Sequence, residues 1–445
     1  MKYKMKKFLL INKKINSFNK SIGISGDKSL SIRCAIMASQ AIGTSKIFNL
    51  LNSEDVNNAL IAIRKLGIKV IQKKNYCEIH GNGLNGFSFR ENTKINAQNS
   101  GTFARLILGV VAKTNKKIVL KGDKSLSNRD FTRVIEPLNK FGMKINSKNN
   151  KLPLKVLGTK YLRPIDYVEL KGSAQVKSCI LLAALNTPGI TKIKCKPSRN
   201  HTELLFKFLK LNLNIKKKNK YDLITLKGEK QYRGFNYRIP GDISSASFFI
   251  VLTLLSKNSK LILKNINVNK TRTGIIDVLK KMNAKILLRN RREYKGEQIS
   301  DIHVYSSNNL KCIKCPKDFN SRLIDELPLI FLACAKAKGT SYFQNLDELR
   351  HKESDRLKLS SKFLKMIGIK NIVNKNSFMI KGNPNLSLSK NFIVKNFMKD
   401  HRIFMLSCIA AMALGGKWKI YDKDSINTSF PKFLKTIEEL GGIFK

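Results

Sequence analysis

The sequence is poor in several residue types that would indicate particular functions. Its 445 residues include one Trp, 10 Pro and only 30 Asp plus Glu. Proteins that bind single-stranded nucleic acid interleave basic side chains with stacking aromatic ones, and no such stretch occurs here. No apolar run reaches the roughly 20 residues of a membrane-spanning helix. The apolar part of the basic N-terminus, Phe8 to Ile11, is too short for the core of a signal sequence.

The shortage of acidic residues leaves a large positive charge. Against 30 acidic side chains stand 85 Lys plus Arg, which gives a formal net charge of +55 at pH 7. Such a balance raises the question of a nucleic-acid or anionic-membrane partner. The excess is mostly Lys, and it is spread along the chain without a basic arm. We therefore expect neither nucleic acid nor a membrane as the main partner, and keep a basic nucleic-acid-binding scaffold as the alternative outside enzyme chemistry.

The eight cysteines indicate a reducing compartment. They occupy positions 34, 77, 179, 195, 312, 315, 334 and 408, mostly inside apolar runs, which is typical of buried thiols. Cys312 and Cys315 form the only close pair, and no second pair or nearby His completes a zinc site. We expect a cytoplasmic protein without a bound metal.

One unit of sequence recurs six times. Each copy opens with a polar cluster, continues as a helix of small and apolar residues, turns, and enters a short strand. In the first copy these parts are residues 28–31, 34–41 and 46–48. The clusters begin at residues 28, 100, 173, 244, 325 and 400, so the repeat is roughly 70–80 residues long, which indicates a repeated supersecondary unit.

A second helix, amphipathic in pattern, follows in every copy and ends on a Gly or Asn. The six residues are Gly67, Gly142, Asn212, Asn283, Gly368 and Gly441. Gly or Asn at this place is typical of a left-handed helix cap. The first helix of each copy is apolar nearly all round, as in residues 180–185 and 248–255. We expect that helix to be buried beneath a sheet and the second helix.

Six units exceed what one core usually holds, so we expect two domains of three units with a boundary near Pro240 and Gly241. The polar clusters then lie at the N-termini of six buried helices. If the two triplets face each other, these ends meet in one cleft whose helix dipoles attract anions. Seven cations accompany the clusters: Lys28, Arg33, Arg129, Arg199, Lys352, Arg356 and Arg402.

The densest group of charges is residues 348–356 (ELRHKESDR), just ahead of an apolar helical pattern. Lys352 and Arg356 there are unfavourable at a helix N-terminus unless an anion is bound. Alone, the segment fits a solvated helix face with an i,i+4 pair of Glu348 and Lys352. Together with the other five clusters, it favours an anion-binding site.

Taken in order, the clusters resemble the EPSP synthase family, the 3-phosphoshikimate 1-carboxyvinyltransferases of the shikimate pathway. The resemblance covers roughly residues 20–435. Its motifs are residues 26–33 (GDKSLSIR), 99–102 (NSGT), 122–129 (GDKSLSNR), 173–178 (SAQVKS), 240–246 (PGDISSA), 325–326 (DE), 349–357 (LRHKESDRL) and 400–402 (DHR).

The resemblance implies an α/β fold of two domains, each an inside-out α/β barrel of three βαβαββ-type units, with six repeats in all. It implies that residues 22–240 form the N-terminal (upper) domain. Residues 1–21 and 241–445 would form the C-terminal (lower) domain. The active site would lie in the interdomain cleft.

The resemblance also implies a reaction, in which the enolpyruvyl group of phosphoenolpyruvate passes to the 5-hydroxyl of shikimate 3-phosphate and phosphate is released. Both substrates are multiply anionic, which suits cations at helix N-termini. The resemblance assigns shikimate 3-phosphate to Lys28, Ser29, Arg33, Ser173, Ala174, Gln175, Arg199, Asp325 and Lys352. It assigns phosphoenolpyruvate to Lys28, Gly101, Arg129, Gln175, Arg356 and Arg402.

The implied reaction is an addition followed by an elimination, so it needs a base at the attacking hydroxyl and an acid at the methylene carbon. By resemblance, Asp325 is the candidate base and Glu353 the candidate acid, with Lys28 assisting proton transfer. Asp325 is also a candidate N-cap for a helix over residues 327–335, and the two roles are compatible. We expect no cofactor, a monomer, and a structural role for His401.

Two departures from the family pattern bear on these assignments. Asp130 stands where the family has Pro, and its charge is expected to weaken phosphoenolpyruvate binding by Arg129. Thr428 stands where some relatives have a substrate-contacting Lys, so no role is assigned to it. The alternative enzyme is the UDP-N-acetylglucosamine enolpyruvyl transferase, which shares fold and donor. It normally uses a Cys acid in the second repeat region, and here no Cys lies between Cys77 and Cys179.

Overall fold

The computed structural model describes residues 8–445. Residues 1–7 lie outside the described residues. They belong to the N-terminal stretch for which the sequence predicts no signal sequence. The chain forms two compact units. Unit 2 comprises residues 26–240 and 293–297, and unit 1 comprises residues 8–25, 241–292 and 298–445. The chain therefore passes between the units after Ser25 and after Pro240, and a short hairpin tip, Glu293–Glu297, is also part of unit 2.

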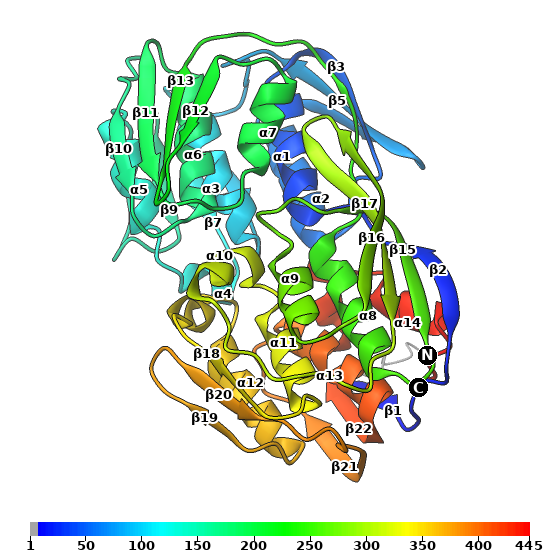
Figure 1. The fold of residues 1–445 in the computed structure, drawn as a ribbon. Helices are drawn as coiled ribbons and strands as arrows, with labels where there is room; N and C mark the ends of the chain where they lie inside the picture. Colours follow the sequence, from blue (N-terminus) through cyan, green and yellow to red (C-terminus); the bar gives the residue numbers. More distant parts are fainter. Residues whose placement is uncertain (1–7) are drawn as a thin grey trace, which may run out of the picture. The chain divides into compact units, whose positions relative to one another are not determined.

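Each unit repeats one arrangement of two helices on a small sheet (Figure 1). In the second copy, the chain runs through β6 (Thr93–Asn96), α3 (Gly101–Val110), β7 (Lys117–Lys121), a short α4 (Lys124–Ser127), α5 (Thr132–Lys140), β8 (Lys144–Asn146) and β9 (Leu154–Leu157). β6 pairs with β7 in parallel, and β9 joins β7 and β8 in antiparallel fashion. This is the expected βαβαββ unit.

The other two copies in unit 2 have the same sheet order. One is β14 (Asn236–Arg238), β3 (Ile42–Phe48), β5 (Tyr76–Asn82) and β4 (Lys69–Gln72), with α1 (Lys28–Ser39) and α2 (Glu54–Lys65). The other is β10 (Asp166–Glu169), β11 (Ile190–Cys195), β13 (Asp222–Lys227) and β12 (Leu213–Lys217), with α6 (Ala174–Leu185) and α7 (His201–Phe208). The first copy is thus completed by a strand from the end of the unit.

Unit 1 contains three further sheets, and its N-terminal strands complete two of them. β2 (Asn19–Gly23) pairs in parallel with β15 (Lys260–Asn267), and β1 (Phe8–Ile11) pairs in antiparallel fashion with β22 (Gly415–Tyr421). The remaining strands are β16 (Ile286–Tyr294), β17 (Glu297–Tyr305), β18 (Thr340–Phe343), β19 (Asn371–Val373), β20 (Phe378–Lys381) and β21 (Leu388–Val394). The helices are α8 (Ile243–Leu255), α9 (Gly274–Lys281), α10 (Asn320–Leu323), α11 (Leu327–Ala335), α12 (Arg356–Met366), α13 (His401–Leu414) and α14 (Phe433–Glu439), with 3-10 turns at Lys317–Phe319, Asp347–His351 and Lys423–Thr428.

The first helix of every copy is buried, as the sequence predicts. Every residue of α8 is buried, and α11 is buried along its whole length. These helices present no polar face because the first helices of a unit pack against one another as well as against the sheets and second helices. In α11, Phe331 packs edge-on against Phe343 and Phe378, with ring centroids 5.0 Å and 4.7 Å apart.

The predicted left-handed caps of the second helices are present in five copies. Gly67, Gly142, Asn283, Gly368 and Gly441 have φ values between 72° and 104°. The prediction for Asn212 is wrong. Helix α7 ends at Phe208, two residues earlier than its pattern indicates, so Lys210 takes the left-handed conformation with φ 55°. The apolar run continues through the cap, which hides the end of the helix in the sequence.

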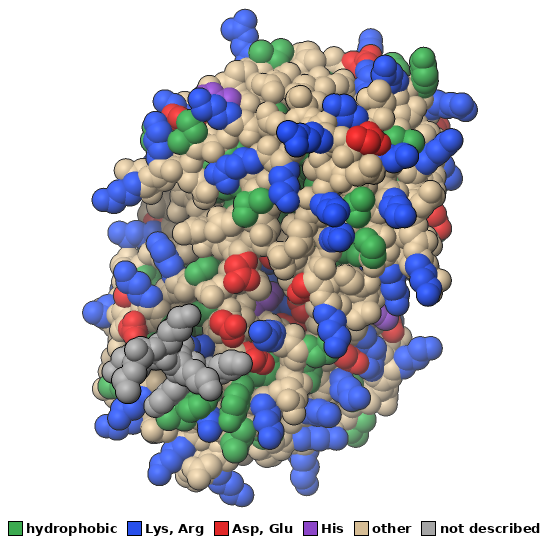
Figure 2. Space-filling model, turned by 180° about the vertical axis from the view of Figure 1, so that it is seen from behind, with side chains coloured by type: hydrophobic (Ala, Val, Ile, Leu, Met, Phe, Trp, Pro, Cys, Tyr) green, Lys and Arg blue, Asp and Glu red, His purple; other side chains and the backbone are tan. Residues whose placement is uncertain are grey.

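The distribution of charged side chains and the lengths of the helices agree with what the composition indicates. Lysines and arginines are scattered over the face seen in Figure 2, without one dense basic patch. Among residues 8–445, no helix is long and apolar enough to cross a membrane.

Candidate active site

The N-terminus of α1 carries the first group of predicted site residues. Asp27 caps the helix by accepting the backbone N–H of Leu30 at 2.8 Å, so Lys28 and Ser29 stand in the first turn. The Lys28 ammonium donates to the Asp55 carboxylate at 2.8 Å. Asp55, a buried acid in the first turn of α2, was missed in the sequence because the contact joins two separate helices.

Arg33 ties three helices of unit 2 together. Its Nε donates to Thr202 Oγ1 at 2.9 Å, one Nη donates to Ser178 Oγ at 3.1 Å, and the other donates to the carbonyl of Ser29. These partners lie on α7, α6 and α1. The Arg33 side chain is 5% exposed. Its three hydrogen bonds join α1, α6 and α7.

A second group gathers at the N-terminus of α3. Arg105 donates to the Gly101 carbonyl at 3.2 Å and to Gln175 Oε1 at 3.1 Å. A Cβ built on Gly101 would lie 2.9 Å from a terminal nitrogen of Arg105 and equally close to one of Arg129. Gly101 therefore allows two guanidinium groups to approach the helix end, where the dipole is already positive.

Arg105 was not singled out from the sequence. Burial, and after it the charges of Arg129 and Arg133, lower the pKa of its guanidinium to about 10. Its spacing, four residues after Gly101 on one helix face, is the signal that could have identified it. A cluster of cations that repel one another is stabilised by a bound anion, so this end of α3 suits an anionic ligand.

Asp130 lies beside this cluster, but its carboxylate is directed to its own loop. It accepts the Thr132 backbone N–H at 2.9 Å and the Thr132 hydroxyl. Partial burial raises the pKa of Asp130, but the bonds from Thr132 and the charges of Arg133 and Arg105 bring it below the usual value. The cations that lower this pKa are thus Arg133 and Arg105.

Ser173, Ala174 and Gln175 form the N-terminus of α6. Ser173 caps the helix, and Gln175 donates to Thr102 Oγ1 at 3.0 Å. The preceding loop is fixed by Glu169, a buried carboxylate that accepts the backbone N–H groups of Lys171, Gly172 and Ser173 at 2.7–3.1 Å. Arg199, half-buried, precedes the other helix of this copy, α7.

In unit 1, Arg356 brings both predicted proton-transfer groups together. It is 1% exposed and donates to Glu353 at 2.5 Å, to Asp325 at 3.5 Å and to Asp400 at 2.9 Å. Burial opposes the charge on this guanidinium, but the three carboxylates raise the pKa of Arg356 above its usual value. Burial likewise raises the pKa of Asp400, and the charge of Arg356 outweighs that effect and lowers it.

Asp325 and Lys352 are 3.8 Å apart in the same cluster. The N-cap position of α11 is Glu326, whose side chain makes no capping bond, so Asp325 does not occupy the predicted cap position. Asp325 and Glu353 remain 18% and 19% exposed, so both carboxylates can reach a ligand.

The segment 348–356 divides into a turn and a helix start. Arg356 is the first residue of α12, and Asp355 caps it by accepting the Lys358 backbone N–H at 2.9 Å. Arg350 donates to Asp355 at 3.0 Å and to the carbonyls of Asn374 and Lys375. Arg350 and Asp355 thus hold the segment that carries Lys352 and Glu353.

Arg402 stands in the first turn of α13, where Asp400 caps the helix by accepting its backbone N–H at 3.0 Å. One terminal nitrogen of Arg402 is buried and has no hydrogen-bond partner among the residues described. Such a donor at a helix N-terminus suits an anionic ligand.

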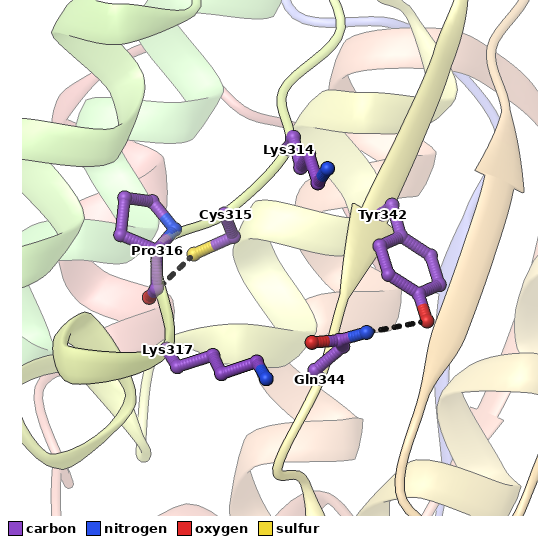
Figure 3. A pocket seen from close by; sticks show the side chains of 6 residues that line it. All are labelled: Lys314, Cys315, Pro316, Lys317, Tyr342 and Gln344. Atoms are coloured by element: carbon purple, nitrogen blue, oxygen red, sulfur yellow. Dashed lines mark hydrogen bonds between the residues drawn. The ribbon is translucent and has the colours of Figure 1, made fainter.

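Two other features lie away from these groups. Cys312 is exposed and Cys315 buried, because in an extended segment residues three apart point to opposite faces, and no group of three metal-ligating side chains occurs between residues 8 and 445. A cavity of about 260 Å³ in unit 1 is lined by Lys314, Cys315, Pro316, Lys317, Tyr342 and Gln344, none of them a predicted site residue (Figure 3).

The sequence matches one family along most of its length. The profile of EPSP synthase (3-phosphoshikimate 1-carboxyvinyltransferase) matches residues 12–437. The chain belongs to the EPSP synthase family. The 3-phosphoshikimate 1-carboxyvinyltransferase of Ruthia magnifica subsp. Calyptogena magnifica is 41% identical over 438 residues, which are 98% of each sequence.

Solved structures of the EPSP synthase family agree. The EPSP synthase of Acinetobacter baumannii, solved at 2.37 Å, superposes with a TM-score of 0.86 at 32% identity and covers 98% of this chain and 99% of its own. The enolpyruvyl transferase NikO of Streptomyces tendae, 14% identical, superposes at 0.77 over 99% of this chain and 98% of its own, and shares the fold. The predicted family and the two-domain α/β fold are confirmed, and the UDP-N-acetylglucosamine alternative is not favoured.

Proposed function

We propose that this member of the EPSP synthase family transfers the enolpyruvyl group of phosphoenolpyruvate to the 5-hydroxyl of shikimate 3-phosphate and releases phosphate. The observation that carries the proposal is the cluster of Asp325, Glu353 and Lys352 around buried Arg356. It places two carboxylates suited to proton transfer beside two cations suited to anionic substrates. Units 1 and 2 then correspond to the two domains of the family, and both contribute residues to one reaction.

In unit 2, shikimate 3-phosphate is bound by helix N-termini and their side chains. Ser173, Ala174 and Gln175 offer a hydroxyl and helix N–H groups to its phosphate, which is the ligand such a helix end attracts. Lys28, Ser29, Arg33 and Arg199 serve the remaining oxygens. Arg33 acts through position as well as charge, because it holds α1, α6 and α7 together.

Phosphoenolpyruvate is bound by the cluster at the α3 N-terminus, with Gly101, Arg129 and Gln175, and by Lys28, Arg356 and Arg402. The guanidinium of Arg356 donates hydrogen bonds to the carboxylates of Asp400, Asp325 and Glu353. A substrate anion therefore reaches Arg356 by displacing Glu353 or Asp325. That exchange releases a proton-transfer group at the moment the substrate arrives, which couples binding to chemistry.

The reaction then needs two proton transfers in the addition and a further one in the elimination. Asp325 takes the proton of the attacking hydroxyl while Glu353 delivers one to the methylene carbon of phosphoenolpyruvate, which gives a ketal. In the elimination a methyl proton returns to a carboxylate and phosphate leaves. Lys28, held by Asp55 at 2.8 Å, assists proton transfer and balances the negative charge.

A phosphate-release assay with phosphoenolpyruvate and two acceptors in parallel tests the proposal. We expect release with shikimate 3-phosphate and none with UDP-N-acetylglucosamine. Release with the second acceptor alone would assign the chain to the alternative reaction. A chain that releases phosphate with neither acceptor, yet binds oligonucleotides tightly at physiological salt, would be the basic scaffold instead.

We further propose that the protein is a cytoplasmic monomer. Its eight cysteines are free thiols, and seven of them are buried, which suits a reducing compartment. Light scattering on the purified protein should give one species near 50.5 kDa.

A further inference from the structure

The residue after the candidate base, Glu326, is a fully buried carboxylate that none of the roles above uses. Its Oε1 accepts a hydrogen bond from the Ser244 hydroxyl. Its Oε2 has no hydrogen-bond partner among residues 8–445. A carboxylate buried in this way is costly unless a cation stands close by.

The direction of the Ser244 bond is fixed by Arg272. A terminal nitrogen of Arg272 donates to Ser244 Oγ at 2.8 Å and to Asp242 Oδ1 at 3.3 Å. Because a guanidinium has no acceptor, Ser244 must accept from Arg272 and can give its own proton only to Glu326. Asp242 also accepts the Ser244 backbone N–H at 2.8 Å. The Glu326 carboxylate is therefore bound by Ser244, a residue in the first turn of α8.

The oxygen that accepts the Ser244 hydroxyl, Oε1, also faces Arg402. The buried terminal nitrogen of Arg402 lies 3.9 Å from Glu326 Oε1, close enough for attraction between charges and too far for a hydrogen bond. The Glu326 carboxylate thus partly balances the charge of Arg402, and the N–H groups of this Arg402 nitrogen remain available to another acceptor. Glu326 Oε2 and this nitrogen are both without hydrogen bonds in the part of the chain described, so attraction between the two charges is what compensates their burial.

We infer that Glu326 is a positioning residue for Arg402. Fixed by Ser244 and Arg272, its charge orients the Arg402 guanidinium so that the free N–H groups meet the anionic donor substrate. The inference rests on the proposed binding of phosphoenolpyruvate by Arg402. The inference adds a role for Glu326, a buried acid that does not touch the substrate. Through Arg402, Glu326 sets the affinity for phosphoenolpyruvate and leaves that for shikimate 3-phosphate unchanged.

Steady-state kinetics of Glu326→Gln tests the inference. The amide keeps the size of the side chain and an oxygen for Ser244, and removes only the charge that faces Arg402. We expect the KM for phosphoenolpyruvate to rise about tenfold, the loss typical of one interaction with a charged group. The KM for shikimate 3-phosphate and kcat should each change less than about twofold, because the lost contact serves ground-state binding of one substrate.

Two further variants separate charge from shape. Glu326→Asp keeps the charge, so its KM for phosphoenolpyruvate should fall between those of the wild type and Glu326→Gln. Ser244→Ala keeps the charge and removes the bond that fixes it, and should raise the same KM by a smaller factor. Asp301→Asn removes a half-buried acid of β17 in the same unit, which faces neither Glu326 nor Arg402 among its hydrogen-bond partners, and should leave both KM values unchanged.

A double-mutant cycle with Arg402→Lys decides whether Glu326 acts through Arg402. If it does, Glu326→Gln has little further effect on the KM for phosphoenolpyruvate once Arg402 is replaced. Additive effects would overturn the inference, as would an unchanged or lower KM in Glu326→Gln alone, or an equal rise for both substrates. A wild-type protein without activity on phosphoenolpyruvate and shikimate 3-phosphate would instead overturn the proposed function.

Discussion

At the scale of single residues, Arg356 holds both candidate proton-transfer groups, and this arrangement makes a kinetic prediction. Asp325→Asn and Glu353→Gln keep side-chain size and a hydrogen-bond acceptor for Arg356 but cannot exchange protons. We expect each to lower kcat by about 10²–10⁴-fold, the usual worth of a general acid or base. Shikimate 3-phosphate binding, measured by calorimetry, should be largely intact because the cations of unit 2 remain.

The control for these variants is Asp355→Asn, which removes the charge of a neighbouring acid but keeps a side-chain oxygen that can cap α12. It should retain kcat within a small factor. Near-normal kcat in both Asp325→Asn and Glu353→Gln would show that the protons move through other groups.

Gly101→Ala tests the close approach of guanidinium groups to α3. The added methyl would lie 2.9 Å from nitrogens of both Arg105 and Arg129, so at least one side chain must move. We expect the KM for phosphoenolpyruvate to rise about tenfold or more, with the KM for shikimate 3-phosphate little changed. Since Gly101 keeps the site open, glyphosate should inhibit the unmodified protein at millimolar concentration and inhibit the variant less. An unchanged KM in the variant would place phosphoenolpyruvate elsewhere.

Thiol chemistry offers a prediction that does not depend on activity. Burial raises the pKa of Cys77 and Cys315 to about 11, and that of Cys179, Cys195 and Cys334 to about 12. Since the thiolate is the reactive form, these groups stay unreactive at pH 8. Ellman's reagent should titrate about one thiol in the native protein, the exposed Cys312, and eight after unfolding. Rapid reaction of several native thiols would contradict the burial.

Single residues also show which contacts cannot be predicted from the sequence. Lys28, Gly101 and Arg356 could be predicted because they lie in motifs that are continuous in the chain. The Lys28 bond to Asp55, the Arg105 bond to Gln175 and the Glu326 contact with Arg402 join residues 27, 70 and 76 positions apart. No local pattern encodes such partners, because they are set by how helices pack.

At the scale of elements, the start of α12 decides where Lys352 and Glu353 stand. Asp355→Ala removes the side chain that accepts the Lys358 N–H, and should lower the free energy of unfolding by about 1 kcal/mol. Asp355→Ser, which restores an acceptor without the charge, should recover most of that loss, because the ion pair with Arg350 is partly exposed and worth little. Urea denaturation measures both. An equal loss in the two variants would assign the effect to Arg350 instead of the cap.

Elements were predictable to the extent that their signals are local. Polar cluster, apolar helix and Gly or Asn cap follow one another within each copy, so all six buried helices could be placed. Lys210 shows the limit, since a cap without Gly or Asn gives no signal. The hairpin tip Glu293–Glu297 shows another. Its Glu297 pairs with His201 at 2.5 Å in unit 2, and nothing in its own sequence indicates that distant contact.

At the scale of the whole molecule, the chain order and the spatial order of the copies differ. β2 comes before unit 2 in the sequence and completes a sheet of unit 1, while β1 completes another. Four buried apolar side chains come with this segment, Leu9, Ile11, Phe18 and Ile24. At about 1.5–3 kcal/mol each, their burial is worth roughly 6–12 kcal/mol. That is comparable to the whole stability of a typical domain, about 5–15 kcal/mol.

A fragment of residues 241–445 should therefore fail to fold alone. Joining residues 1–25 to its N-terminus should restore cooperative unfolding, because the Asp242 N–H donates to the Ser25 carbonyl at 3.0 Å and the two ends lie close enough for a short linker. Circular dichroism with thermal melting compares the two fragments, and a third with Ile11→Asp and Phe18→Asp in the joined segment tests whether burial is the cause. Cooperative melting of residues 241–445 alone would show that unit 1 does not need its N-terminal strands. Failure of the joined fragment would show that unit 1 requires unit 2, so that the two fold as one.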